Sequence, residues 1–155
     1  MPEFNQRSPF APCPVYRDVK GALKWLQDAF GFDIHMIIAD ADENVVHCEM
    51  IHDGAILMVA KEWTDDHKSP AHVDGKNTQS IHVNLKSGID EHCERARRAG
   101  AKIEQEPETQ FYGDRTYRAR DPEGHIWTFG MPVKQMNSEE WDKAAGPGVK
   151  TRTTL

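Results

Sequence analysis

Two segments of this sequence resemble each other, and their repetition constrains the fold more than any other feature. Residues 111–130 have the pattern of two strands joined by a tight turn at Asp121-Pro-Glu-Gly124. The proline suits the first corner of such a turn, and the glycine supplies the backbone freedom that its far end needs. Residues 45–60 repeat this layout around the turn His52-Asp-Gly54. The pattern therefore predicts one structural unit that is present twice.

A strand, a helix and a second strand precede each of these hairpins. In the first copy we expect them at residues 11–16, 19–30 and 32–38. Apolar residues recur at helical spacing within the helix and give it one apolar face, and Gly31 ends it. Asp18, just before the helix, is a suitable N-cap. The second copy has the same order, with its elements at residues 80–85, 89–99 and 101–105.

The spacing of matched glycines agrees with a duplication. Gly100 follows Gly31 by 69 residues, and Gly124 follows Gly54 by 70. A repeat of this length makes two modules, because a solenoid needs more copies. One helix per module covers one face of a four-stranded sheet, so the other face stays open unless the modules curve toward each other. We predict an α+β protein of two tandem β-α-β-β-β modules that form a cupped mixed sheet, with the site in the cup.

Composition changes along the chain suggest where the segments begin and end. The stretch from Trp63 onward is polar and contains Pro70 and Gly75, which is typical of a linker. The expected division is a flexible leader at 1–9, a first module at 10–62, a linker at 63–78, a second module at 79–133, and a C-terminal tail with a short helix at 134–155.

Charge and hydropathy exclude several classes of partner. The formal net charge is −6 with no basic stripe, which argues against nucleic-acid binding. No apolar run approaches the ~20 residues that span a bilayer, and the N-terminus lacks the apolar segment of a secretion signal. Cys13, Cys48 and Cys93 are far apart and odd in number, so free thiols in a reducing compartment are expected. Cytoplasmic location, without a membrane partner, follows as the default.

Three segments carry a resemblance to a known family: residues 18–31, Tyr112-Gly-Asp-Arg115, and residues 121–129. Together they resemble the vicinal oxygen chelate superfamily, which contains glyoxalases, extradiol dioxygenases, fosfomycin-modifying enzymes and bleomycin resistance proteins. The resemblance covers about residues 10–132 and implies the glyoxalase/bleomycin resistance-like fold. Many relatives are homodimers, so it also implies a second copy as partner. It leaves open whether the modules pair within one chain or across a dimer.

The resemblance also implies where a metal would bind. Metalloenzymes of the superfamily place four ligands on four inward-facing strand positions, usually His or Gln, Glu, His and Glu. Carried over to this sequence, the positions fall near Ala11, near Met58, at His82 and at Thr128. Only His82 is a good metal ligand. We therefore assign no cofactor, with a divalent metal at His82 as the open alternative, and expect a protein that binds a small organic molecule in the cup.

His47 and Glu49 support a different function. They alternate with Val46, Cys48 and Met50, which are expected on the helix side, so in a strand His47 and Glu49 lie on the opposite face. Together with His82 they could form a substitute metal site or an acid/base pair. The alternative function is thus a metal- or histidine-dependent enzyme of lyase, isomerase or dioxygenase type. Alternatively, His47 and Glu49 have only a structural role, as a hydrogen-bonded cross-strand pair that shapes the pocket.

Aromatic residues near strand ends are suited to stacking against a flat ligand. Phe111 and Tyr117 could instead fill the core, which is favoured for Phe111, whereas His92, among charged residues of a helix, is expected at the surface. Arg115 could add charge or a cation–π contact. The residues predicted to bind the ligand are His47, Glu49, Met58, Trp63, His82, Asn84, Tyr112, Arg115, Tyr117 and Thr128; no catalytic residue is assigned beyond the candidates His47, Glu49 and His82.

Overall fold

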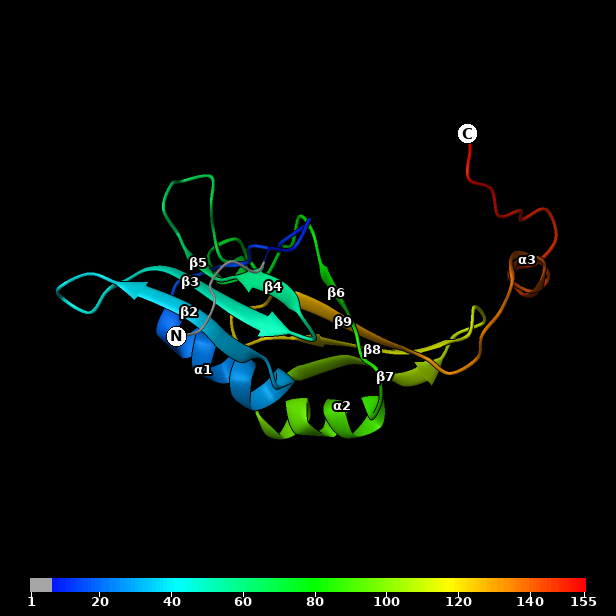
Figure 1. Cartoon of the computed structure of the whole chain (residues 1–155), viewed down its shortest axis with the longest axis horizontal. Helices are drawn as coiled ribbons and strands as arrows, with labels where there is room; N and C mark the ends of the chain where they lie inside the picture. Colours follow the sequence, from blue (N-terminus) through cyan, green and yellow to red (C-terminus); the bar gives the residue numbers. More distant parts are fainter. Residues whose placement is uncertain (1–6) are drawn as a thin grey trace.

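The computed structural model describes residues 7–155 and contains the predicted pair of β-α-β-β-β modules (Figure 1). The first module consists of β1 (Val15–Tyr16), α1 (Val19–Phe30), β2 (Asp33–Ala39), β3 (Val45–His52), β4 (Ala55–Met58) and β5 (Ala60–Lys61). The second consists of β6 (Ile81–Asn84), α2 (Ile89–Arg98), β7 (Lys102–Thr109), β8 (Asp114–Arg120) and β9 (Ile126–Pro132). The predicted α+β class is confirmed. Residues 1–6 of the predicted leader lie outside the described residues.

The two modules share one strand order. In the second module the order is β6-β9-β8-β7, with β6 parallel to β9 and the other neighbours antiparallel. The first module contains the antiparallel sheet β2-β3-β4 and the parallel pair β1-β5. The amide of Met58 donates to the Pro12 carbonyl at 3.0 Å, which continues the β1 pairing back along β4. The order β2-β3-β4/β5-β1 therefore matches that of the second module.

The first helix begins and ends at the predicted residues. Asp18 is its N-cap, and the Asp18 Oδ1 accepts a hydrogen bond from the Gly21 amide at 2.9 Å. Gly31 ends the helix in the left-handed region, at φ 71°. Figure 1 shows α1 and α2 side by side on the same side of the two sheets. The opposite face of each sheet has no helix of the two modules over it.

A single hydrophobic core extends through both modules. Phe30, at the end of α1, lies 4.7 Å from Phe129 and 5.2 Å from Trp127 between ring centroids, and both partners belong to β9. On β3 the buried residues that face this core are Cys48 and Met50. The open faces of the sheets are therefore fixed by the strand period of two, since the alternate residues must point away from the helices.

The turn between β8 and β9 links the modules by hydrogen bonds. The Asp121 Oδ2 accepts from Tyr16 Oη at 2.6 Å and from Trp127 Nε1 at 3.0 Å. The Glu123 carboxylate accepts from the backbone amides of Arg17 and Asp18 at 2.8 and 3.1 Å. We call these contacts of Asp121 and Glu123 the inter-module clasp. They give a physical reason for the acidic residues of the Asp121-Pro-Glu-Gly124 turn.

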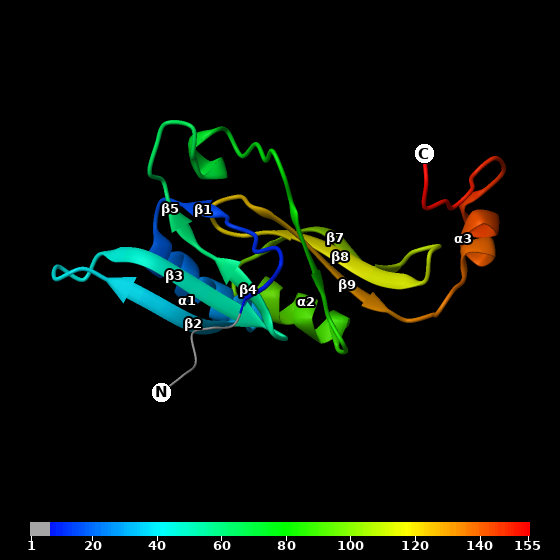
Figure 2. The same cartoon turned by 45° about the horizontal axis from the view of Figure 1, so that its top comes forward.

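The remaining segments lie outside the two modules. The linker contains the 3₁₀ helix η1 (Pro70–His72). Figure 2 shows the linker as a whole looping above β1 and β5. The tail contains α3 (Ser138–Ala145), which begins with a capping box of Asn137 and Glu140. Both figures show α3 beyond the tip of the β7–β8 hairpin, away from the modules. No helix among the described residues is long and apolar enough to cross a bilayer.

Candidate functional site

A pocket of about 270 Å³ lies where β4 of the first module approaches β6 of the second. We call it the inter-module pocket. The two strands are close together in Figures 1 and 2. Its lining residues come from both modules and are Pro12, Phe32, Met50, Ile51, His52, Asp53, Ala55, Ile56, Leu57, Ile81, His82, Val83, Asn84 and Trp127.

The floor of the pocket is apolar and partly aromatic. The rings of Phe32 and Trp127 lie 5.8 Å apart, and Met50 and Leu57 are buried beside them. The Trp127 ring is held in place by the hydrogen bond that its Nε1 donates to Asp121. A concave apolar surface with a few polar groups is the usual composition of a small-molecule site.

Polar side chains lie on two sides of this floor. The ring of His52, at the end of β3, lies 5.2 Å from that of Phe32 in a tilted arrangement. Asp53 adopts a positive φ of 47° in the turn and forms an ion pair with Lys86 of the second module. From the β6 side come His82 and Asn84. The inter-module pocket therefore offers imidazole, carboxylate and amide groups to the polar parts of a ligand.

The strand register shows where the four positions at which the resemblance predicts metal ligands lie relative to one another. His82 and Thr128 are direct neighbours in the parallel β6–β9 pair. In the first module Val15 pairs with Ala60, so two residues back along both strands Cys13 lies opposite Met58. The residue opposite Met58 is thus Cys13, two residues from Ala11, near which the resemblance placed the first position.

The side chains at these four positions do not fit the usual metal site. They are a thiol, a thioether, an imidazole and a hydroxyl, and burial raises the pKa of the Cys13 thiol, which disfavours the thiolate that a metal needs. The imidazole of His82 lies over Gly130, where an added Cβ would come within 2.9 Å of Nε2. Gly130 therefore leaves room for His82 on the open face of the second sheet.

His47 and Glu49 lie on the open face of the first sheet, and they contact each other. His47 Nε2 lies 3.0 Å from Glu49 Oε1. Glu49 is only 2% exposed, and among the described residues its Oε2 has no hydrogen-bond partner. Its neighbours across the strands are Met36 and Met58. The third predicted partner, His82, belongs to the other sheet and lines the inter-module pocket instead.

The structure moves two predicted ligand contacts to the helix side of the second sheet. Tyr117 is fully buried and stacks on Phe129 with 5.0 Å between centroids, and its hydroxyl contacts His92 Nδ1 at 2.6 Å. Arg115, two residues earlier on the same face, forms an ion pair with Asp90 of α2 at 2.7 Å. The strand alternation that points Thr116 to the open face necessarily points both residues toward α2.

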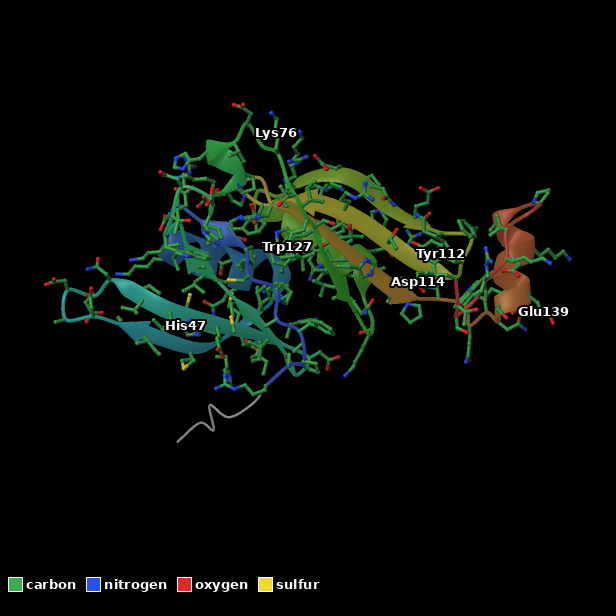
Figure 3. All side chains as sticks on the ribbon, turned by 90° about the horizontal axis from the view of Figure 1, so that it is seen from above. His47, Lys76, Tyr112, Asp114, Trp127 and Glu139 are labelled. Carbon is green, nitrogen blue, oxygen red and sulfur yellow. The ribbon has the colours of Figure 1, made fainter. Side chains whose placement is uncertain are left out.

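The other predicted aromatic contacts lie apart from the inter-module pocket. Figure 3 shows Tyr112 and His47 on opposite sides of Trp127 and far from each other. The Tyr112 carbonyl accepts from Trp141 Nε1 of α3 at 3.0 Å, and neighbouring Phe111 is exposed. Trp63 stacks on His67 at 3.8 Å and lines a second, more polar hollow of about 640 Å³ beside the linker. The predicted residues thus separate into several groups.

Of the residues that line the inter-module pocket, only His82 and Asn84 were predicted from the sequence; Phe32, His52 and Asp53 are among those that were missed. The last two border the hairpin turn at Gly54, and a polar pair at the end of a strand is the signal that could have identified them. Phe32 gave no such signal, because a buried phenylalanine after a helix is typical of a core.

One further group has the residue types of a metal site. The ligand atoms of Cys93, Glu94 and Glu106 lie within 4.8 Å of one another. However, Arg97 donates to Glu106 at 2.6 Å and to Glu94 at 3.2 Å, and burial raises the pKa of Cys93 to about 11. An arginine already neutralises these carboxylates, so the group fits a surface ion-pair network better than a metal centre.

Comparison with known proteins agrees with this architecture. A model of the Glyoxalase/Bleomycin resistance protein/Dioxygenase superfamily matches residues 15–129. TioX from Micromonospora sp. ML1 is 31% identical, with a TM-score of 0.64 over 84% of this chain and 100% of that chain. The uncharacterized protein Rv0887c of Mycobacterium tuberculosis is 26% identical over 141 residues, covering 88% of this chain and 82% of its own.

A more distant structure shows the same fold. The fosfomycin resistance protein FosX of Listeria monocytogenes, solved with Mn(II) and sulfate, is 13% identical with a TM-score of 0.58 over 80% of this chain and 91% of that chain. At this identity the likeness concerns the fold alone. The family match covers most of the chain, and the predicted resemblance is confirmed. The chain belongs to the glyoxalase, bleomycin resistance protein and dioxygenase superfamily.

Proposed function

We propose that the protein binds a small organic molecule in the inter-module pocket, without the four-ligand metal site of its metalloenzyme relatives. The composition of the pocket carries this proposal: Phe32 and Trp127 form a buried aromatic floor, while His52, His82 and Asn84 supply polar groups. Removing apolar ligand surface from water contributes roughly 25 cal/mol per Å², and the few polar groups orient the ligand.

The donor set supports binding without a metal. Of the four positions Cys13, Met58, His82 and Thr128, only His82 is a good ligand for a hard divalent ion. A single imidazole binds such an ion too weakly to compete with the water that otherwise coordinates it. We therefore assign His82 a contact with the organic ligand.

Thermal unfolding of the protein in the presence of EDTA and a panel of aromatic compounds tests the proposal. A true ligand at a hundred times its Kd stabilises the folded state by about 2.7 kcal/mol, which raises the melting temperature. We expect His82→Ala to weaken binding about tenfold, the effect of one hydrogen bond. The control His72→Ala, in the linker beside Glu62, should bind as the wild type does. A panel without any stabilising compound, or stoichiometric metal that disappears in His82→Ala, would contradict the proposal.

A histidine-dependent enzyme is the second candidate, and the 3.0 Å contact between His47 and Glu49 favours it. A carboxylate beside an imidazole fixes the orientation of the ring, as a general base requires. Under this function His47→Ala would abolish turnover of a small carbonyl or hydroxyl compound while leaving its binding intact. Binding without turnover in the wild type would favour the first function.

We also propose that the protein acts in the cytoplasm as a homodimer. Cys48 and Cys93 are buried free thiols, which fits a reducing compartment. The edge strand β2 exposes Ile37 and Ile38 by 46% and 48%, and such an edge is suited to covering by a second copy. Light scattering during gel filtration tests the assembly, since a chain of 17.6 kDa that elutes with its monomer mass would exclude the dimer.

A further inference from the structure

Glu49 is an unusual residue for the centre of a sheet. Its side chain is 2% exposed, and only one of its two carboxylate oxygens has a partner, His47 Nε2 at 3.0 Å. The other oxygen, Oε2, is buried and has no hydrogen-bond partner among the described residues. A buried polar atom without a partner loses its hydration without compensation, and the loss is larger if the atom is charged. Such a group requires an explanation.

A second buried carboxylate in the same chain shows what a purely structural one looks like. Asp121 is 5% exposed, and both of its oxygens are used. Oδ1 accepts from the amides of Glu123 and His125, and Oδ2 accepts from Tyr16 and Trp127. Glu49 lacks this full set of donors. Its free oxygen is therefore suited to receive a donor that the chain itself does not supply.

Glu49 does not itself line the inter-module pocket, but it lies two residues from one that does. Ile51, which lines the pocket, is two residues further along β3 and lies on the same face, at about 7 Å by the strand rise. On β4, Ile56 pairs with Ile51 and Met58 pairs with Glu49. The Glu49–Met58 pair is therefore the next pair on the same face after Ile51–Ile56. Met36 and Met58, the cross-strand neighbours of Glu49, are unbranched and adapt their shape easily.

We propose that the ligand is an organic amine: an apolar ring system occupies the inter-module pocket, and a basic nitrogen on a short arm donates to Glu49 Oε2. His47 holds the other oxygen and so fixes the direction of the carboxylate. The cation restores the missing hydrogen bond and balances the buried charge. This inference rests on the proposed function and specifies its ligand class.

Three naphthalene probes with the same ring and arm length test the inference, carrying a terminal amine, a hydroxyl or a carboxylate. Their Kd values are measured by isothermal titration calorimetry with EDTA present. We expect the wild type to bind the amine at least about tenfold more tightly than the alcohol, as for a charge-assisted hydrogen bond. In Glu49→Gln this preference disappears. The matched control Glu108→Gln, which removes an exposed carboxylate from β7, keeps it.

The outcomes separate this inference from the proposed function. If the probes bind without preference for the amine, or Glu49→Gln keeps the preference, the amine assignment is wrong and the pocket function stands. If no probe binds, both fail. Thermal unfolding of unliganded Glu49→Gln gives an independent readout, because we expect it to be at least as stable as the wild type. A marked loss of stability would assign Glu49 a structural role and overturn the inference.

Discussion

Both ring nitrogens of His92 have partners, one in each module. Nε2 lies 2.9 Å from the Phe30 carbonyl and must donate to it, so Nδ1 accepts from the Tyr117 hydroxyl at 2.6 Å. This arrangement requires the neutral ring. Burial lowers the pKa of His92, since the charged form loses its hydration. Protonation of this ring at acidic pH is therefore expected to destabilise the folded protein.

The pH dependence of stability follows from this shift. The unfolded chain binds a proton at His92 near the ordinary pKa of about 6.5, whereas the folded protein resists it. The free energy of unfolding is therefore expected to fall as the pH drops below about 6.5. Urea unfolding at several pH values between neutral and mildly acidic checks this, and His92→Gln should show a weaker dependence than the wild type. An equal dependence in His92→Gln would contradict the account.

At the same scale, the sequence could not predict the environment of His92. Its neighbours Asp90 and Glu91 are charged, so we expected a surface role. The ring is instead half-buried, 4.5 Å from Phe129 and stacked on Phe30 at 6.0 Å. These contacts come from residues far away in the chain, and only the packing of α1 beside α2 brings them together.

Among the elements, the turn between β8 and β9 has a role beyond reversing the chain. Its carboxylates form the inter-module clasp with Tyr16, Trp127 and the start of α1. The turn itself was predictable, because proline and glycine have strong positional preferences there. The partners of its acidic residues were not, since they belong to the other module.

Replacing Asp121 tests the clasp. In Asp121→Asn an NH₂ group replaces one carboxylate oxygen. This group then faces a hydrogen-bond donor, either Tyr16 Oη and Trp127 Nε1 or the backbone amides of the turn. We expect a loss of about 2–3 kcal/mol in the free energy of unfolding, measured by urea denaturation. The control Asp66→Asn, at an exposed position of the linker, should change it by less than about 0.5 kcal/mol. An equally small effect for Asp121→Asn would show that the clasp adds little.

Strand facing was also predictable at the element scale, but strand length was not. The alternation correctly placed Cys48 and Met50 in the core, but Val46, which was expected with them, is 62% exposed near the start of β3. The strand expected at 11–16 is only Val15–Tyr16, because Pro12 and Pro14 lack amide protons and contribute only their carbonyls to the pairing.

For the whole molecule, the repeat in the sequence predicted the doubled topology, and the family match confirms its class. The arrangement of the modules was not predictable, since nothing in the local pattern says that α1 packs beside α2. The inter-module pocket depends on that arrangement. Its floor residues Phe32 and Trp127 look like core residues in the sequence, and only the approach of β4 to β6 turns them into a lining.

The central claim is that an organic ligand binds the inter-module pocket without a metal, and NMR titration tests it most directly. Amide spectra of labelled protein are recorded in EDTA with increasing concentrations of an aromatic ligand. The account predicts saturable shifts concentrated at Ile51, Ile56, Ile81 and Val83, which line the pocket. Shifts concentrated instead around Trp63 and the linker, or binding that appears only when a divalent metal is added, would contradict it.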